Sequence, residues 1–145
     1  RYGLASPRLQ WLRAVPYPSA EVRHGEQADT DSGPDHPIAI ARSDAHVVVR
    51  AAGRVIADTR RALELREANY PPVLYIPRAD ADMASLQRTD HASYCPYKGE
   101  ASYFSIRGGA GNAVWSYEAP HAAVAEIRDH LAFYPDRVEA IEANR

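Results

Sequence analysis

Apolar and polar residues alternate over several short stretches in the middle of the chain. Residues 46–50 and 54–58 are two apolar, β-branched-rich runs separated by Ala-Ala-Gly, a pattern typical of a β-hairpin. Residues 101–107 and 112–118 alternate on either side of a glycine-rich turn and predict a second hairpin. Two hairpins in the central part of the chain favour a domain built mainly from strands.

Weaker patterns predict two more strands and three short helices. Residues 62–67 have helical propensity, but their leucines alternate with charges, so we favour a strand. Residues 73–76 form an apolar run between prolines and predict a buried strand. Capping residues and apolar spacing predict three short helices. The first covers residues 80–86, and the second has Pro120 in its first turn and Val124, Ile127 and Leu131 on one side. The last begins at a capping box formed by Asp136 and Glu139.

The first part of the chain lacks such periodicity. Residues 1–36 contain several prolines and glycines and predict an irregular N-terminal arm. We expect residues 37–145 to form one domain, because a chain of 145 residues is long enough to bury one hydrophobic core but is short for two domains. We expect a mainly β fold with short peripheral helices, in the α+β class.

Composition limits the classes of function. The formal net charge is −2, so no overall positive field attracts nucleic acid. No apolar run approaches the roughly 18 residues of a membrane span, so we expect no membrane partner. A single cysteine excludes an intrachain disulfide and fits a reducing compartment, which predicts a cytoplasmic protein. The oligomeric state is not predicted.

Reactive side chains are concentrated between His91 and Glu100. This segment holds the single cysteine, Cys95, and the single lysine, Lys98, with Tyr97 between them. Every other basic residue that carries a permanent charge is an arginine. We therefore place the candidate site here.

Cys95 has two interpretations. His91 and Lys98 would lower the pKa of its thiol if the segment folded back on itself, which would favour a nucleophilic thiolate. Alternatively, Cys95 is a small buried hydrophobic residue without chemistry. The proline that follows it excludes the simple assumption that His91 and Cys95 share one face of a helix.

Lys98 and the neighbouring aromatic residues also have two interpretations each. Lys98 could bind an anion or act as a nucleophile, or it could pair with Glu100. Tyr97, Tyr103, Trp115 and Tyr117 could line a ligand pocket that is apolar but has polar tips, or they could form ordinary core.

Metal and cofactor sites are not predicted. One cysteine and scattered histidines do not supply the four ligands of structural zinc. The glycine-rich turn over residues 108–111 joins two strands and lacks the Gly-Lys-Ser/Thr of a phosphate-binding loop. We therefore expect no metal and no cofactor.

Several motifs resemble a known family, the bacterial and fungal proteins that contain domain of unknown function 427. The resemblance covers roughly residues 38–141. Its pieces are Arg54–Thr59, Pro71–Pro77, Asp82–Met83, His91, Cys95–Gly99, Ala101–Tyr103, Asn112–Tyr117, Ala132–Tyr134 and Asp136–Val138.

This resemblance implies a fold rather than an activity. Members of the family are similar to β-tent proteins, in which two antiparallel sheets meet at an angle. Proteins with this architecture often carry zinc on paired cysteines, which this chain lacks. The family is also filed under a nucleotidyltransferase label, but this sequence has no Gly-Ser followed by paired aspartates to support that activity.

Three functions remain open from the sequence. The first is a domain that binds a small polar or anionic metabolite, with His91 and Lys98 at the rim of an aromatic pocket. The second is a thiol-dependent enzyme that uses Cys95 with His91 or Lys98. The third is a protein-interaction domain that uses the N-terminal arm. We favour the first, although the sequence does not name the ligand.

Overall fold

Ten antiparallel strands make up about half of residues 36–145, the part of the chain that the computed structural model describes. The strands are β1 (Ile38–Arg42), β2 (His46–Ala51), β3 (Arg54–Thr59), β4 (Leu63–Glu67), β5 (Val73–Tyr75), β6 (Leu86–Cys95), β7 (Gly99–Ile106), β8 (Val114–Tyr117), β9 (Ala132–Phe133) and β10 (Ala140–Asn144). Four short 3-10 helices connect them: η1 (Arg78–Asp80), η2 (Met83–Ser85), η3 (Ala122–Ile127) and η4 (Pro135–Arg137). The expected N-terminal arm lies outside the described residues, apart from its last residue.

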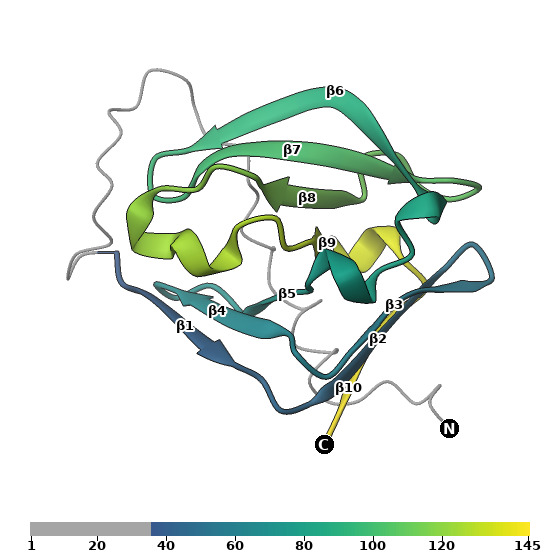
Figure 1. The fold of residues 1–145 in the computed structure, drawn as a ribbon, viewed down its shortest axis with the longest axis horizontal. Coiled ribbons are helices and arrows are strands. Elements are labelled where there is room, and N and C mark those ends of the chain that lie inside the picture. Colours follow the sequence, from purple (N-terminus) through teal and green to yellow (C-terminus); the bar gives the residue numbers. More distant parts are fainter. Residues whose placement is uncertain (1–35) are drawn as a thin grey trace.

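Main-chain hydrogen bonds divide the strands into three sheets. Their orders are β1-β4-β5, β10-β2-β3 and β6-β7-β8-β9, and all pairs are antiparallel. Ile76 and Leu131 exchange two backbone hydrogen bonds of 2.8 Å, which link the end of β5 to the start of β9. The sheet of β6, β7 and β8 lies across from β1 and β4 (Figure 1). The mainly β prediction is confirmed.

The two predicted hairpins are present. β2 pairs with β3 in register, apart from a bulge between Val49 and Arg50. β7 pairs with β8, and Tyr103 lies opposite Trp115. Residues 62–67 also form the predicted strand, because the leucines at 63 and 65 face the interior of the domain between two neighbouring strands.

The helix expected over residues 80–86 is wrong. Two 3-10 turns replace it, and β6 begins at Leu86. Asp80 does not cap a helix, because its carboxylate accepts hydrogen bonds from Thr59 and Arg61. The backbone N–H of Asp82 donates to the carbonyl of Ile56 at 2.7 Å, so the segment follows the edge of β3 instead of coiling.

The two later helices are also shorter than expected. η3 is a kinked 3-10 helix that buries Val124 and Ile127, as the spacing predicted, but Leu131 lies beyond it beside β5. The last helix, expected to begin at Asp136, is wrong, because η4 ends at Arg137 and the chain continues as β10. β10 pairs with the edge of β2, which supplies partners for its backbone N–H and C=O groups.

Adjacent residues of β7 belong to different hydrophobic clusters. Phe104 packs with residues of β2, β3 and β10, whereas Tyr103 packs with residues of β4, β5 and η3. Successive side chains of a strand point to opposite faces, so the β6–β9 sheet contributes to both clusters. The predicted site belongs to the second cluster, between this sheet and β1-β4-β5.

Candidate functional site

The predicted site residues lie on β6, β7, β8 and the turn between β6 and β7. His91 and Cys95 are part of β6 rather than of a loop. Tyr97 and Lys98 lie in the turn, and Glu100 is the second residue of the return strand β7. Glu100 is exposed and pairs across the strands with Tyr94, so it lies on the face of the sheet opposite to the other candidates.

Gly99 allows the turn to close tightly. Its φ of +113° is a conformation that residues with a side chain rarely adopt, and an added Cβ would lie 3.4 Å from the carbonyl oxygen of Ala119. The N–H of His121 donates to the carbonyl of Lys98 at 3.0 Å and fixes the turn against the segment after β8. This closure directs the side chain of Lys98 inward, where the whole residue is only 4% exposed.

The turn holds a buried chain of charged and aromatic groups. The Lys98 amine forms an ion pair with Glu67 of β4, rather than with Glu100. The other carboxylate oxygen of Glu67 lies 2.6 Å from Nε2 of His36, and the His36 ring stacks on Tyr97 with centroids 3.8 Å apart. Charges buried this deeply need such partners, because desolvation otherwise destabilises them strongly.

Opposing effects set the ionisation of Glu67. Burial pushes the pKa of its carboxyl upward, but the charge of Lys98 and the hydrogen bonds from Lys98 and His36 outweigh burial. The pKa of Glu67 therefore lies below its usual value. The ionised carboxylate keeps the interior near Lys98 close to electrical neutrality.

An aromatic cluster extends inward from this ion pair. Trp115 donates its indole N–H to the hydroxyl of Tyr75 at 3.3 Å, and its ring lies 4.5 Å from that of Tyr134. Tyr103 shares a 2.8 Å hydrogen bond with Ser93. The His91 ring lies 4.4 Å from that of Tyr103, which brings His91 to the border of the same cluster. Such aromatic side chains combine apolar faces with hydroxyl tips.

Tyr117 is the unusual member of this cluster. It is fully buried, and its hydroxyl has no hydrogen-bond partner among the described residues. Burial raises the pKa of Tyr117 well above its usual value, and the neighbouring Tyr75, Cys95 and Tyr103 add to the effect. A buried hydroxyl without a partner costs about 1–3 kcal/mol, so native proteins rarely retain one without a reason.

Cys95 lies among the aromatic residues and is 3% exposed. A thiol enclosed by other side chains has little access to reagents. Its position fits the interpretation of a small buried hydrophobic residue. Within residues 36–145, no three histidine, cysteine, aspartate or glutamate side chains are grouped to hold a metal ion.

Sequence reasoning missed the site residues contributed by β4, β5, the segment after β9 and the start of the domain. These residues, Glu67, Tyr75, Tyr134 and His36, contact predicted site residues but lie far from them in the chain. One signal was available for Glu67: it alternates with Leu63 and Leu65, which places its side chain on the inner face of the strand. A carboxylate at an inward position requires a buried partner.

The opposite face of the β6–β9 sheet carries a separate polar cluster. Glu118 accepts hydrogen bonds from Arg78 at 2.7 Å, from Ser102 at 3.1 Å and from Arg88. The guanidinium groups of both arginines also lie over the ring of Phe104, at 5.4 and 5.2 Å. Burial raises the pKa of Glu118, but these hydrogen bonds more than reverse the effect and lower it. The full set of contacts indicates a structural role.

Comparison with known families gives a match that covers most of the chain. A family model described as "Domain of unknown function (DUF427)" matches residues 39–144. The chain belongs to the DUF427 family. This match contains every predicted site residue of the DUF427 domain, together with Glu67 and Tyr75, whereas His36 precedes it. No curated protein matches the sequence. No helix within residues 36–145 is long and apolar enough to cross a membrane.

Proposed function

We propose that this DUF427 domain binds a small polar molecule between β4 and β5 on one side and β6, β7 and β8 on the other. The unpartnered hydroxyl of Tyr117 carries the proposal. A ligand that hydrogen-bonds this hydroxyl would remove the cost of burying it. The surrounding rings of Tyr75, Tyr103 and Trp115 suit a flat ligand that stacks on them or meets their edges.

The charges near the cluster favour a neutral ligand over an anion. Lys98 was the candidate anion-binding group, but Glu67 balances its charge. A ligand anion would therefore compete with a buried carboxylate that Lys98 already holds. A neutral heterocycle with hydrogen-bonding edges matches both the aromatic walls and this balance.

A route into the cluster is suggested by its partly exposed border. The side chain of His36 is 21% exposed, and Tyr97 packs at the edge of the cluster while remaining half-buried. Their stacked rings form a side-chain contact and not a strand pair. We propose that separation of these two rings admits the ligand.

Substitution of Tyr117 by phenylalanine tests the proposal. The change removes one hydroxyl and keeps the ring, so the free protein should unfold at the same temperature or a higher one. The affinity for any bound heterocycle should fall about tenfold or more, since each tenfold change corresponds to about 1.4 kcal/mol. Calorimetry with a panel of neutral nucleobases, nucleosides and nicotinamide measures both quantities.

Tyr94→Phe is the matched control, because Tyr94 lies on the opposite face of β6 and its hydroxyl is 3.5 Å from His121. This variant should bind the same compounds with unchanged affinity. Equal binding by the Tyr117→Phe variant, or no binding by any member of the panel, would contradict the proposal. The thiol-dependent enzyme and the protein-interaction domain would then be the remaining candidates.

A further inference from the structure

β1 forms one edge of the β1-β4-β5 sheet, and within residues 36–145 no strand pairs with its other side. The carbonyl of Pro37 accepts a hydrogen bond from the segment that continues β4, and the N–H of Ser43 donates to the segment that precedes it, both at 2.9 Å. In an antiparallel pair, residues bonded in this way alternate with residues whose N–H and C=O groups point away. The backbone groups of Ile38, Ile40 and Arg42 therefore face away from β4.

This edge lacks the usual protection against a further strand. Its first four residues are Ile-Ala-Ile-Ala and carry no charge. Ile38 and Ile40 are only partly buried against the aromatic cluster, and Ala39 and Ala41 are exposed on the other face. Proteins usually protect such edges with charged side chains, prolines or bulges. Here the segment before η2 hydrogen-bonds to the edge of β3, and a register shift interrupts β6.

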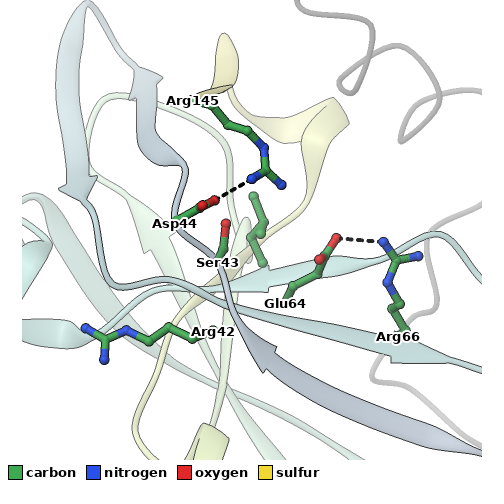
Figure 2. Close-up of a pocket in the computed structure, with 7 residues that line it drawn as sticks. Arg42, Ser43, Asp44, Glu64, Arg66 and Arg145 are labelled. Carbon is green, nitrogen blue, oxygen red and sulfur yellow. Dashed lines mark hydrogen bonds and ion pairs between the residues drawn. The ribbon is translucent and has the colours of Figure 1, made fainter.

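Charges on the neighbouring strand indicate which partner fits this edge. On the exposed face, Ala39 lies opposite Arg66 of β4, and Ala41 lies opposite Glu64. The side chains of Arg66 and Glu64 contact each other at 3.3 Å and are 64% and 32% exposed. Figure 2 shows this ion pair, with the Arg42 side chain extending in another direction. The two alanines of the edge thus lie beside charges of opposite sign.

We propose that β1 pairs antiparallel with β1 of a second copy of this chain, which joins the two three-stranded sheets into one. With Ile40 opposite the same residue of the second copy, Ala39 of each chain lies opposite Ala41 of the other. Each row on the exposed face then runs from Arg66 of one copy across two alanines to Glu64 of the other. Opposite charges end both rows, and the small alanines leave space for the long side chains.

The same charges select the register. A shift by two residues in one direction would place Ala39 opposite itself and an arginine at each end of that row. A shift in the other direction would place Ala41 opposite itself and a glutamate at each end. Like charges across strands are destabilising. The register centred on Ile40 avoids both and pairs all five residues of β1, and its twofold symmetry closes the assembly as a dimer.

The dimer should be weak, because two five-residue strands form a small contact compared with the roughly 1,200–2,000 Å² of stable interfaces. Sedimentation of the full chain between about 10 μM and about 1 mM, a range of weak affinities, should show monomer giving way to dimer. Hydrogen exchange at the amides of Ile40 and Arg42 should slow over the same range. A monomer at every concentration would refute the proposal. Slow exchange of these amides in the monomer would equally overturn it, since the chain itself would then cover the edge.

Charge variants at the exposed alanines separate this interface from general association. Ala39→Lys combined with Ala41→Lys places like charges opposite each other twice per dimer and should weaken dimerisation about fivefold or more. Overall repulsion cannot cause this loss, because the two changes bring the formal net charge from −2 to zero. Ala39→Glu combined with Ala41→Lys places opposite charges in the same positions and should dimerise at least as well as the wild type. Equal dimerisation by both variants would overturn the proposal, and thermal unfolding checks that both fold.

Cysteines at the same two positions test the register. When Ala39→Cys protein is mixed with Ala41→Cys protein and mildly oxidised, disulfide-linked heterodimers should form, because directly opposite residues lie about 4.5–5.5 Å apart. Either variant alone should form few linked dimers, since its cysteines would be diagonal neighbours about 7–8 Å apart. Cys95 is 3% exposed and should not interfere. Efficient linking of either variant with itself would contradict the register centred on Ile40.

Discussion

At the scale of single residues, the contact between Lys98 and Glu67 is a buried ion pair within the candidate site. Both side chains are nearly buried, at 5% and 6% exposed. A buried ion pair contributes little compared with an apolar pair of the same volume, but loss of one partner leaves an uncompensated charge. The pair therefore determines which substitutions the turn after β6 tolerates.

Lys98→Met should destabilise the protein by about 3–5 kcal/mol, because Glu67 then remains buried without its main partner. The double variant Lys98→Met with Glu67→Leu should recover most of this loss. Urea unfolding of the wild type, both single variants and the double variant gives the coupling energy between the two positions. Additive effects of the two substitutions would mean that the ion pair is not formed in the folded protein.

Cys95 provides a second prediction at the residue scale. Because it is 3% exposed among aromatic side chains, its thiol should react with iodoacetamide far more slowly in the folded protein than in urea. Mass spectrometry after timed alkylation at neutral pH measures both rates. Fast alkylation of the folded protein near pH 6, slowed by His91→Ala, would instead support the thiol-dependent enzyme.

At the scale of elements, the turn between β6 and β7 positions both Tyr97 and Lys98. Its conformation depends on Gly99, whose backbone also passes close to Ala119 and Pro120. The β6–β7 hairpin and the segment after β8 are therefore joined at one glycine. A side chain there would disturb the hairpin and the buried ion pair together.

Gly99→Ala should destabilise the protein by about 1–3 kcal/mol or more, through backbone strain and the close approach to Ala119. Gly53→Ala is the control in the β2–β3 turn, where φ is +72° but nothing lies within 4 Å of an added Cβ. This variant should lose only about 1 kcal/mol, the usual cost of the left-handed conformation. Thermal unfolding measures both, and equal losses would exclude a special role of the turn at Gly99.

At the scale of the whole molecule, carboxylates with lowered pKa values tie distant segments together. Glu67 joins β4 to the β6–β7 turn, Asp80 joins η1 to the β3–β4 connection, and Glu118 joins η1 to β6. Hydrogen bonds from Arg61 and Thr59 lower the pKa of Asp80. Each carboxylate stabilises the fold in its ionised form, so acid should weaken several contacts at once.

The stability of the protein should therefore fall as the pH drops below about 4.5, the usual pKa of a glutamate. A lowered pKa in the folded state stabilises the protein above the unfolded pKa, and this contribution disappears as the pH falls through the folded value. Glu67→Gln should be less stable than the wild type at pH 7, and the difference should shrink toward pH 3. Unfolding temperatures between pH 7 and pH 3 measure this difference.

Glu126→Gln is the control for this pH series, because Glu126 is exposed and away from these contacts. Its unfolding temperatures should follow those of the wild type at every pH. A constant difference between wild type and Glu67→Gln over the whole range would show that Glu67 does not contribute through its ionised form.

The sequence by itself determined the hairpins and the class of the fold. Strand alternation and a glycine-rich turn are local signals, since each depends on neighbours within a few residues. These signals predicted the β2–β3 and β7–β8 hairpins, both of which are present. The motifs around Cys95 and Trp115 likewise identified the family from short segments.

Only the tertiary structure decided which segments complete the sheets and the site. Residues 80–86 and 136–139 have local capping patterns for helices, yet hydrogen bonds to β3 and β2 hold these regions as turns and strands. Glu67 contacts Lys98 across 31 residues, and Tyr75 contacts Trp115 across 40. Such contacts form because burial brings distant polar groups together, and each buried group then requires a partner. No pattern along the chain encodes that pairing.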